Sequence, residues 1–312
     1  MDKVIEVQNL RKVYGLAKGR ELEAVKATSF EVFTGEIFGI LGPNGAGKTT
    51  TLEIIECLKP QTSGSVVALG FDNLKQPEEI KKRIGVQLQS SQYLHHLSLG
   101  ELLDLFRSFY QNRQVSTDKN SLLKLVGLED KIQEQFANLS GGQKQRFTIA
   151  TSLVNEPEIL FLDEPTTGLD PKARRDMWQL IKTINARGIT IVLTTHYMEE
   201  AEYLCHRVAI MDQGKILEID EPKKLIDRLS DTTQISFFTD AQINPQIFKT
   251  IPEIKKVQAD FPKLTLEITS LDKISAVVNL LRQQQIIFYG FTVKTATLED
   301  VYLDLTGKAY EE

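Results

Sequence analysis

One stretch of the chain, GPNGAGKT at residues 42–49, constrains the fold more than any other. It has the pattern GxxxxGK[ST], in which the glycines allow several backbone N–H groups to point at one anion. The apolar run IFGIL at residues 37–41 precedes it, and apolar side chains follow it at helical spacing. Because the turn lies between a predicted buried strand and a predicted helix, it indicates a phosphate-binding loop rather than a simple glycine-rich connection.

The residues of this loop have separate predicted roles. The loop backbone and the N-terminal end of the following helix are expected to bind phosphate oxygens. Lys48 can reach the β- and γ-phosphates of a nucleotide, and the hydroxyl of Thr49 can ligate Mg²⁺. The predicted nucleotide-binding residues of the loop are Gly42, Pro43, Asn44, Gly45, Ala46, Gly47, Lys48, Thr49 and Thr50.

Length and composition limit the class of protein. A chain of 312 residues is long enough for two domains. Its net charge of −5 argues against a surface built for nucleic-acid phosphates. Cys57 and Cys205 lie far apart in the sequence, as expected of a reduced cytoplasmic protein. No apolar run approaches the ~20 residues needed to span a bilayer, so we expect a soluble chain whose membrane role comes through a partner.

The patterning along the chain predicts two domains. Residues 4–13 and 22–33 resemble strands of a small antiparallel β region. Leucine and phenylalanine at helical spacing predict an inserted helical lobe over about residues 90–140. We therefore expect an α/β first domain over residues 1–225, with a mixed sheet at its core. The order strand, helix, two strands, helix, strand, helix predicts a small α+β accessory domain over residues 232–312.

A second group of candidate residues lies at the ends of two predicted buried strands. Asp163 and Glu164 end the apolar run ILFL, and ligands of parallel sheets collect at such strand ends. Asp163 can hold Mg²⁺, and Glu164 can orient or deprotonate a water molecule. The alternative is a solvated acidic turn. His196 follows the next strand and can donate to a γ-phosphate oxygen, although a lone histidine is more often structural.

Three further features are ambiguous from the residues alone. Ser140 is a natural helix N-cap, and the helix start at residues 140–143 can bind an anion, but such a stretch is also ordinary loop chemistry. Tyr14 stands at a strand end, where it can stack on a nucleotide base or cover the sheet edge. Trp178 lies beside apolar residues of a predicted helix, so we expect it to pack in the core rather than to stack on a base.

The fixed order of these motifs resembles the nucleotide-binding subunit of ATP-binding cassette (ABC) transporters over residues 4–221. The resemblance implies the P-loop NTPase fold of such cassettes, with ATP and Mg²⁺ as ligands. Residues 42–49 match the Walker A loop of the family. Asp163 matches the Walker B aspartate that holds Mg²⁺, and Glu164 matches the catalytic glutamate.

The same resemblance implies roles for three more residues. His196 resembles the switch histidine of the family, and Tyr14 falls where the family stacks an aromatic ring on adenine. Gln89 resembles the glutamine that touches Mg²⁺ and the attacking water, and whose loop senses the membrane partner. The loop at residues 168–170 resembles the one that links the two sites of a dimer.

The resemblance also implies a partner of the same kind. In the family, two cassettes bind head to tail, and each ATP lies between the Walker A loop of one subunit and the LSGGQ motif of the other. The residues of that motif expected to contact ATP in trans are Ser140, Gly141, Gly142 and Gln143. Because this chain has one cassette with every catalytic position filled, a homodimer is the simplest expectation, and a heterodimer is the alternative.

The sequence around His196 and the tail TLEDVYLDLTG at residues 297–307 resemble the drug- and antibiotic-resistance type of bacterial export ATPase. Such subunits work with a separate integral-membrane permease, which implies a cytoplasmic chain on the inner face of the cell membrane.

Two other classes of protein are the alternatives to an export ATPase. A soluble ABC ATPase acting on nucleic acid or ribosomes is disfavoured by the acidic net charge. A regulatory module without turnover is disfavoured by the presence of Glu164 and His196.

Overall fold

The computed structural model describes residues 2–15, 21–87, 93–94, 96–110, 117–229, 233–269 and 273–308. The chain divides into two compact units, the first ending at Glu221 and the second beginning at Pro222. Each unit is described by itself.

The core of the first unit is a six-stranded sheet in the order β10-β9-β3-β8-β7-β6. Its strands are β3 (Ile37–Leu41), β6 (Ile84–Gln87), β7 (Ile159–Asp163), β8 (Thr190–Thr195), β9 (Arg207–Asp212) and β10 (Lys215–Asp220). All neighbours pair in parallel except β9 and β10, which form an antiparallel hairpin. Strands β3, β7 and β8 are buried along their whole length, as expected of central parallel strands. The carboxyl ends of these three strands therefore meet at one edge of the sheet.

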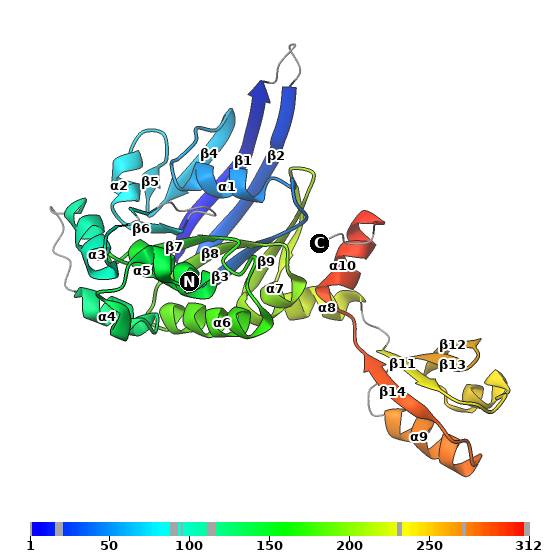
Figure 1. Ribbon diagram of the computed structural model, residues 1–312. Helices are drawn as coiled ribbons and strands as arrows, with labels where there is room; N and C mark the ends of the chain where they lie inside the picture. Colours follow the sequence, from blue (N-terminus) through cyan, green and yellow to red (C-terminus); the bar gives the residue numbers. More distant parts are fainter. Residues whose placement is uncertain are drawn as a thin grey trace. The chain divides into compact units, whose positions relative to one another are not determined.

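A four-stranded antiparallel sheet in the order β2-β1-β4-β5 forms the second layer of this unit. Its strands are β1 (Lys3–Gly15), β2 (Glu21–Phe33), β4 (Ser63–Ala68) and β5 (Phe71–Asp72). Helix α1 (Lys48–Ile55) contacts strands of both sheets, and a common apolar core unites Leu52 of the helix with side chains from both layers (Figure 1). The α/β fold and its antiparallel β region are as predicted.

The remaining helices of the first unit are α2 (Pro77–Lys81), α3 (Leu99–Ser108), α4 (Lys119–Leu125), α5 (Gly141–Ser152), α6 (Pro171–Asn185) and α7 (Met198–Leu204). Helices α3, α4 and α5 contact one another, and α3 and α4 occupy the stretch predicted as a helical lobe (Figure 1). Ser98 and Asp118 cap α3 and α4 by accepting hydrogen bonds from backbone N–H groups of the first turn. These caps explain why both helices begin where they do.

The second unit begins with helix α8 (Pro222–Leu229), which the predicted order did not include, and the elements that follow it surround their own core. They are β11 (Thr233–Phe238), a 3-10 helix (Pro245–Thr250), β12 (Ile254–Asp260), β13 (Lys263–Ile268), α9 (Ile274–Gln283), β14 (Tyr289–Lys294) and α10 (Leu298–Thr306). The strands form an antiparallel sheet in the order β12-β13-β11-β14. Apolar side chains of this sheet, Phe237 and Leu266 among them, pack with Val277 and Leu281 of α9. Within the described ranges, no helix has the length and apolar character needed to cross a bilayer.

Candidate active site

The loop between β3 and α1 has the backbone of a phosphate-binding turn. Gly45 and Gly47 adopt φ angles of +80° and +104°, a region that favours glycine. A Cβ atom on Gly42 would collide with the backbone oxygen of Met211, and one on Gly47 with that of Ala24. Gly47 is therefore required both by backbone conformation and by the close approach of neighbouring chain, whereas Gly42 is required by close approach alone.

Lys48, the first residue of α1, is 4% exposed and is tied to the loop that precedes it. Its Nζ atom donates to the carbonyl oxygens of Gly42 at 2.7 Å and Pro43 at 3.2 Å. The same atom lies 3.4 Å from Oε1 of Glu164. Burial lowers the pKa of Lys48, while the neighbouring carboxylates of Glu164 and Asp163 oppose that change. The ammonium group thus stands between the loop and the acidic end of β7.

Asp163, the last residue of β7, joins three segments of the site. Its Oδ1 atom accepts hydrogen bonds from the hydroxyls of Thr49, at 3.2 Å, and Thr194. Burial raises the pKa of Asp163, and these two hydroxyl donors oppose the rise. Hydroxyl and carboxylate oxygens are ligands that Mg²⁺ prefers, so the donor set formed by Asp163 and Thr49 fits this ion.

Glu164 follows with an unusual backbone conformation, a φ of +48°. Its backbone N–H donates to both oxygens of Thr194, Oγ1 at 3.0 Å and the carbonyl at 3.2 Å, which holds this strained turn in place. Its Oε2 atom accepts from the hydroxyl of Thr167 at 3.1 Å and lies 3.1 Å from Nδ1 of His196. The ring of His196 is therefore within ion-pair distance of this carboxylate.

The charge state of Glu164 suits a general base. Burial alone would raise the pKa of this carboxyl, but the charge of Lys48, the neighbouring ring of His196 and the hydroxyl of Thr167 together more than offset burial and lower it. Glu164 is therefore ionised at neutral pH while only 8% exposed. The structure thus brings together five residues predicted from the sequence, Lys48, Thr49, Asp163, Glu164 and His196.

The predicted residues at the start of α5 lie elsewhere. Ser140 and Gly141 are exposed, while Gly142 and Gln143 are half-buried. Ser140 and Gln143 form a capping box, in which Ser140 Oγ accepts from Gln143 N at 3.4 Å and Gln143 Oε1 accepts from Ser140 N at 3.0 Å. This confirms Ser140 as the N-cap. Among the described residues, no hydrogen bond or ion pair joins this tetrapeptide to the phosphate loop.

Two other predicted site residues stand apart. Tyr14 lies near the end of β1, and the Nζ atoms of Lys12 and Lys59 lie 5.0 and 5.8 Å from the centroid of its ring. The role of Tyr14 in stacking on adenine stays a prediction. Gln89 lies outside the described residues, so its predicted contacts with Mg²⁺ and water also stay predictions.

The structure adds residues that the sequence did not single out. Thr194 binds both Asp163 and Glu164, and Thr167 binds Glu164. Glu200 on α7 is fully buried and accepts a hydrogen bond from Trp178, which is buried as predicted. Thr194 lies near the end of β8, two residues before His196, and Thr167 lies three residues after Glu164. This closeness to the predicted residues is the one signal that could have found them. Nothing in the sequence distinguishes Glu200 from the other acids of α7.

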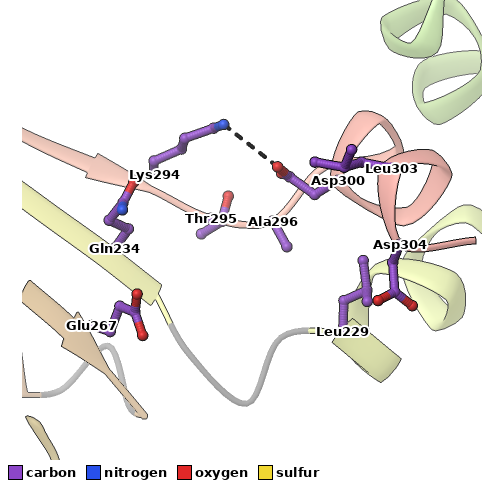
Figure 2. Close-up of a pocket in the computed structure, with 9 residues that line it drawn as sticks. All are labelled: Leu229, Gln234, Glu267, Lys294, Thr295, Ala296, Asp300, Leu303 and Asp304. Atoms are coloured by element: carbon purple, nitrogen blue, oxygen red, sulfur yellow. Dashed lines mark ion pairs between the residues drawn. The ribbon is translucent and has the colours of Figure 1, made fainter. Parts of the chain in front are cut away.

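A hollow of about 350 Å³ is present in the C-terminal unit. Figure 2 shows its lining, which comprises Leu229, Gln234, Glu267, Lys294, Thr295, Ala296, Asp300, Leu303 and Asp304. An ion pair of 3.6 Å joins Lys294 and Asp300 beside it. None of these residues belongs to the phosphate-loop site, so the hollow is not the place where the motifs predict ATP.

Comparison with known proteins identifies the family. Residues 25–167 match the family described as ABC transporter. The chain is 32% identical over 317 residues to the linearmycin resistance ATP-binding protein of Bacillus subtilis, a match that covers 99% of this chain and 100% of the relative. The chain belongs to the ATP-binding subunits of ABC transporters. As a member, it is an ATPase, and the predicted enzyme class is confirmed.

Two further matches agree with this membership. The subunit is 33% identical over 312 residues to the Nod factor export ATP-binding protein I of Rhizobium etli, covering 99% of this chain and 95% of that one. A dimeric ATP-binding cassette solved in a post-hydrolysis state with ADP and Pi covers 70% of this chain and 98% of its own, with a TM-score of 0.63 and 29% identity. The structural match confirms the predicted cassette fold.

Proposed function

We propose that this ABC ATPase powers the export of a drug, antibiotic, lipid or similar compound through a separate integral-membrane permease. The observation that carries the proposal is the extent of similarity to proteins named for linearmycin resistance and for Nod factor export, which reaches 99% of this chain. The similarity therefore includes the C-terminal unit as well as the cassette. The identity of the exported compound is determined by contacts in the permease rather than in this chain.

The geometry of the site supports a distinct role for each side chain. Lys48 neutralises the β- and γ-phosphates, and the loop amides with the α1 N-terminus bind their oxygens. Glu164 acts as the general base toward the attacking water, because it is ionised and buried next to Lys48. His196, at the end of β8, donates to the γ-phosphate. Tyr14 stacks on adenine.

Thr49 and Asp163 would hold Mg²⁺, together with Gln89. Support comes from the donor set, because the Thr49 hydroxyl already contacts the Asp163 carboxylate. When bound, the ion supplies charge neutralisation for the phosphate oxygens. Thr194 of the neighbouring strand β8 donates to the Asp163 carboxylate and so helps to fix its orientation.

We infer that the working unit is a dimer of two copies of this chain. The start of α5 supports this proposal, since Ser140 and Gly141 are exposed and the capping box satisfies only part of the N-terminal donors of the helix. The helix end delivered by a second copy would bind the γ-phosphate of the ATP on the first. A structurally similar cassette is dimeric in a state bound to ADP and Pi.

The proposed location is the cytoplasmic face of the cell membrane, where the permease would hold this subunit. No observation on the sequence or the structure favours the alternative of an ATPase acting on nucleic acid, and the net charge of −5 opposes it.

Purification of the tagged chain from its native membranes in mild detergent tests the proposal that it works with a permease. A stoichiometric membrane protein with several spans supports export, whereas co-purifying ribosomes or nucleic acid would refute it.

A further inference from the structure

A buried carboxylate lies behind the catalytic edge and is not used by the mechanism above. Glu200, in the first turn of α7, is 0% exposed. Its Oε1 atom accepts two hydrogen bonds, from the hydroxyl of Thr166 at 2.8 Å and from Nε1 of Trp178 at 2.9 Å. A carboxylate is costly to bury unless donors compensate it, and these two contacts to Oε1 offset part of that cost.

The donors come from the segments that carry the chemistry. Thr166 lies two residues after Glu164 and is itself fully buried. Glu200 lies four residues after His196, with α7 beginning between them. The hydrogen bond between Thr166 and Glu200 therefore connects the turn that bears the proposed base to the turn that bears the proposed γ-phosphate donor. Trp178 extends the connection to α6.

Neighbouring contacts strengthen the same connection. Burial raises the pKa of Glu200, whereas the hydroxyl of Thr195, next to His196, and the charge of Arg174 oppose the rise. The guanidinium of Arg174 lies 4.0 Å from the ring centroid of Tyr197, whose ring is 4.1 Å from that of His196. Arg174 belongs to α6, which Asp170 caps at the end of the loop that follows Glu164. The turn that bears Glu164 and the turn that bears His196 are thus both connected to the carboxylate of Glu200.

We propose that Glu200 is a positioning residue that aligns the Glu164 turn with the His196 turn, so that both side chains reach the γ-phosphate together. The inference rests on the roles proposed for Glu164 and His196. It predicts that removing the carboxylate lowers turnover while ATP binding, which depends on Lys48 and the loop, is largely kept. A merely structural role would instead lower both, through loss of folded protein.

The first test compares Glu200→Gln and Glu200→Ala with the matched variant Glu199→Ala in the full chain. Glu199 is the neighbouring acid on the same helix and is exposed. We expect Glu200→Ala to lower kcat about 10–100-fold, the usual effect of losing an outer-shell partner, and to change the Kd for ATP less than about threefold. The isosteric Glu200→Gln should recover part of kcat, because its carbonyl oxygen still accepts from Thr166 and Trp178.

A second test does not depend on activity. Trp178 is the single tryptophan of the chain, and its N–H group donates to Glu200. We expect MgATP to change Trp178 fluorescence in the wild type and in Glu199→Ala. Thr166→Val keeps the shape of the side chain but removes its hydrogen bond to Glu200, so we expect the fluorescence change to be lost in this variant. The variant also serves if Glu200→Ala does not fold.

The outcomes separate this inference from the proposed function. If the wild type hydrolyses ATP and Glu200→Gln, Glu200→Ala and Thr166→Val all retain wild-type kcat, the positioning role is wrong. The role is also refuted if kcat and ATP affinity fall together in well-folded Glu200→Gln. If the wild type binds ATP without hydrolysing it, the roles proposed for Glu164 and His196 are wrong, and the positioning role that rests on them is wrong as well.

Discussion

The Nζ atom of Lys48 lies 3.4 Å from Oε1 of Glu164, and both side chains are more than nine-tenths buried. In this arrangement one ammonium group faces both the phosphate-binding loop and the proposed base. The γ-phosphate would compete with Glu164 for this charge. The charge of Lys48 lowers the pKa of Glu164. If the ammonium group of Lys48 turns toward the phosphate when ATP binds, this effect weakens and Glu164 becomes a stronger base.

Lys48→Ala should abolish tight ATP binding. Hydrogen bonds to charged groups are worth about 1.5–3 kcal/mol each, so the loss of affinity should be roughly 100-fold or more. Titration calorimetry of ATP in the presence of Mg²⁺ measures the effect. Lys75→Ala is the matched control, because the Lys75 side chain is 81% exposed and should leave the affinity unchanged. Equal affinities for Lys48→Ala and the wild type would refute the phosphate-binding role.

Glu164→Gln should keep ATP binding and stop turnover. The amide preserves the shape of the side chain but cannot accept a proton, and general-base catalysis contributes about 10²–10⁴-fold in rate. We also expect an ATP-bound dimer to accumulate, which light scattering after size-exclusion chromatography detects. Glu78→Gln serves as the control, since the Glu78 side chain is 73% exposed. Hydrolysis at the wild-type rate in Glu164→Gln would remove Glu164 from the mechanism.

The site residues that could be predicted from the sequence are those fixed by chain geometry. Asp163 ends β7 and His196 directly follows the neighbouring strand β8, so their convergence follows from the parallel sheet. Glu200 could not be found in this way, because Glu199 and Glu200 are adjacent acids on one helix. Only the packing of α7 shows that Glu199 is exposed and Glu200 buried. The proposed contacts of Ser140 are made to ATP bound by a second chain. Such contacts cannot be seen in the sequence pattern or in the fold of one chain.

A buried carboxyl at the C-terminal end of α1 predicts an unusual dependence of stability on pH. Glu56 is 2% exposed, and its Oε1 atom has no hydrogen-bond partner among the described residues. Burial, together with the charges of Asp163 and Glu53, raises the pKa of Glu56 to about 8. The folded state therefore holds this proton where the unfolded state has released it. The contribution of protonated Glu56 to the free energy of unfolding is full below the ordinary carboxyl pKa of about 4.3. It is lost as the pH rises to about 8.

Glu56→Gln should remove that loss of stability. The quantity of interest is the free energy of unfolding of the variant minus that of the wild type. We expect this difference to increase between pH 4.5 and pH 8 by about 1.36 kcal/mol for each pH unit, and by at most about 5 kcal/mol in total. Urea denaturation followed by circular dichroism at several pH values measures this difference. Glu78→Gln is the control, because the Glu78 side chain is 73% exposed. A difference between Glu56→Gln and wild type that does not vary with pH would show that Glu56 is ionised in the folded protein.

Tyr14→Ala should weaken ATP binding through the base rather than through the phosphates. Stacking of an aromatic ring on a base is worth about 1–3 kcal/mol, which corresponds to a loss of affinity on the order of tenfold. Tyr14→Phe keeps the ring and should bind ATP like the wild type. Competition by inorganic triphosphate, which has no base, should be the same in all three proteins. If Tyr14→Ala weakens ATP and triphosphate equally, the residue acts on the phosphate loop or on the end of β1, and adenine must be held by another side chain.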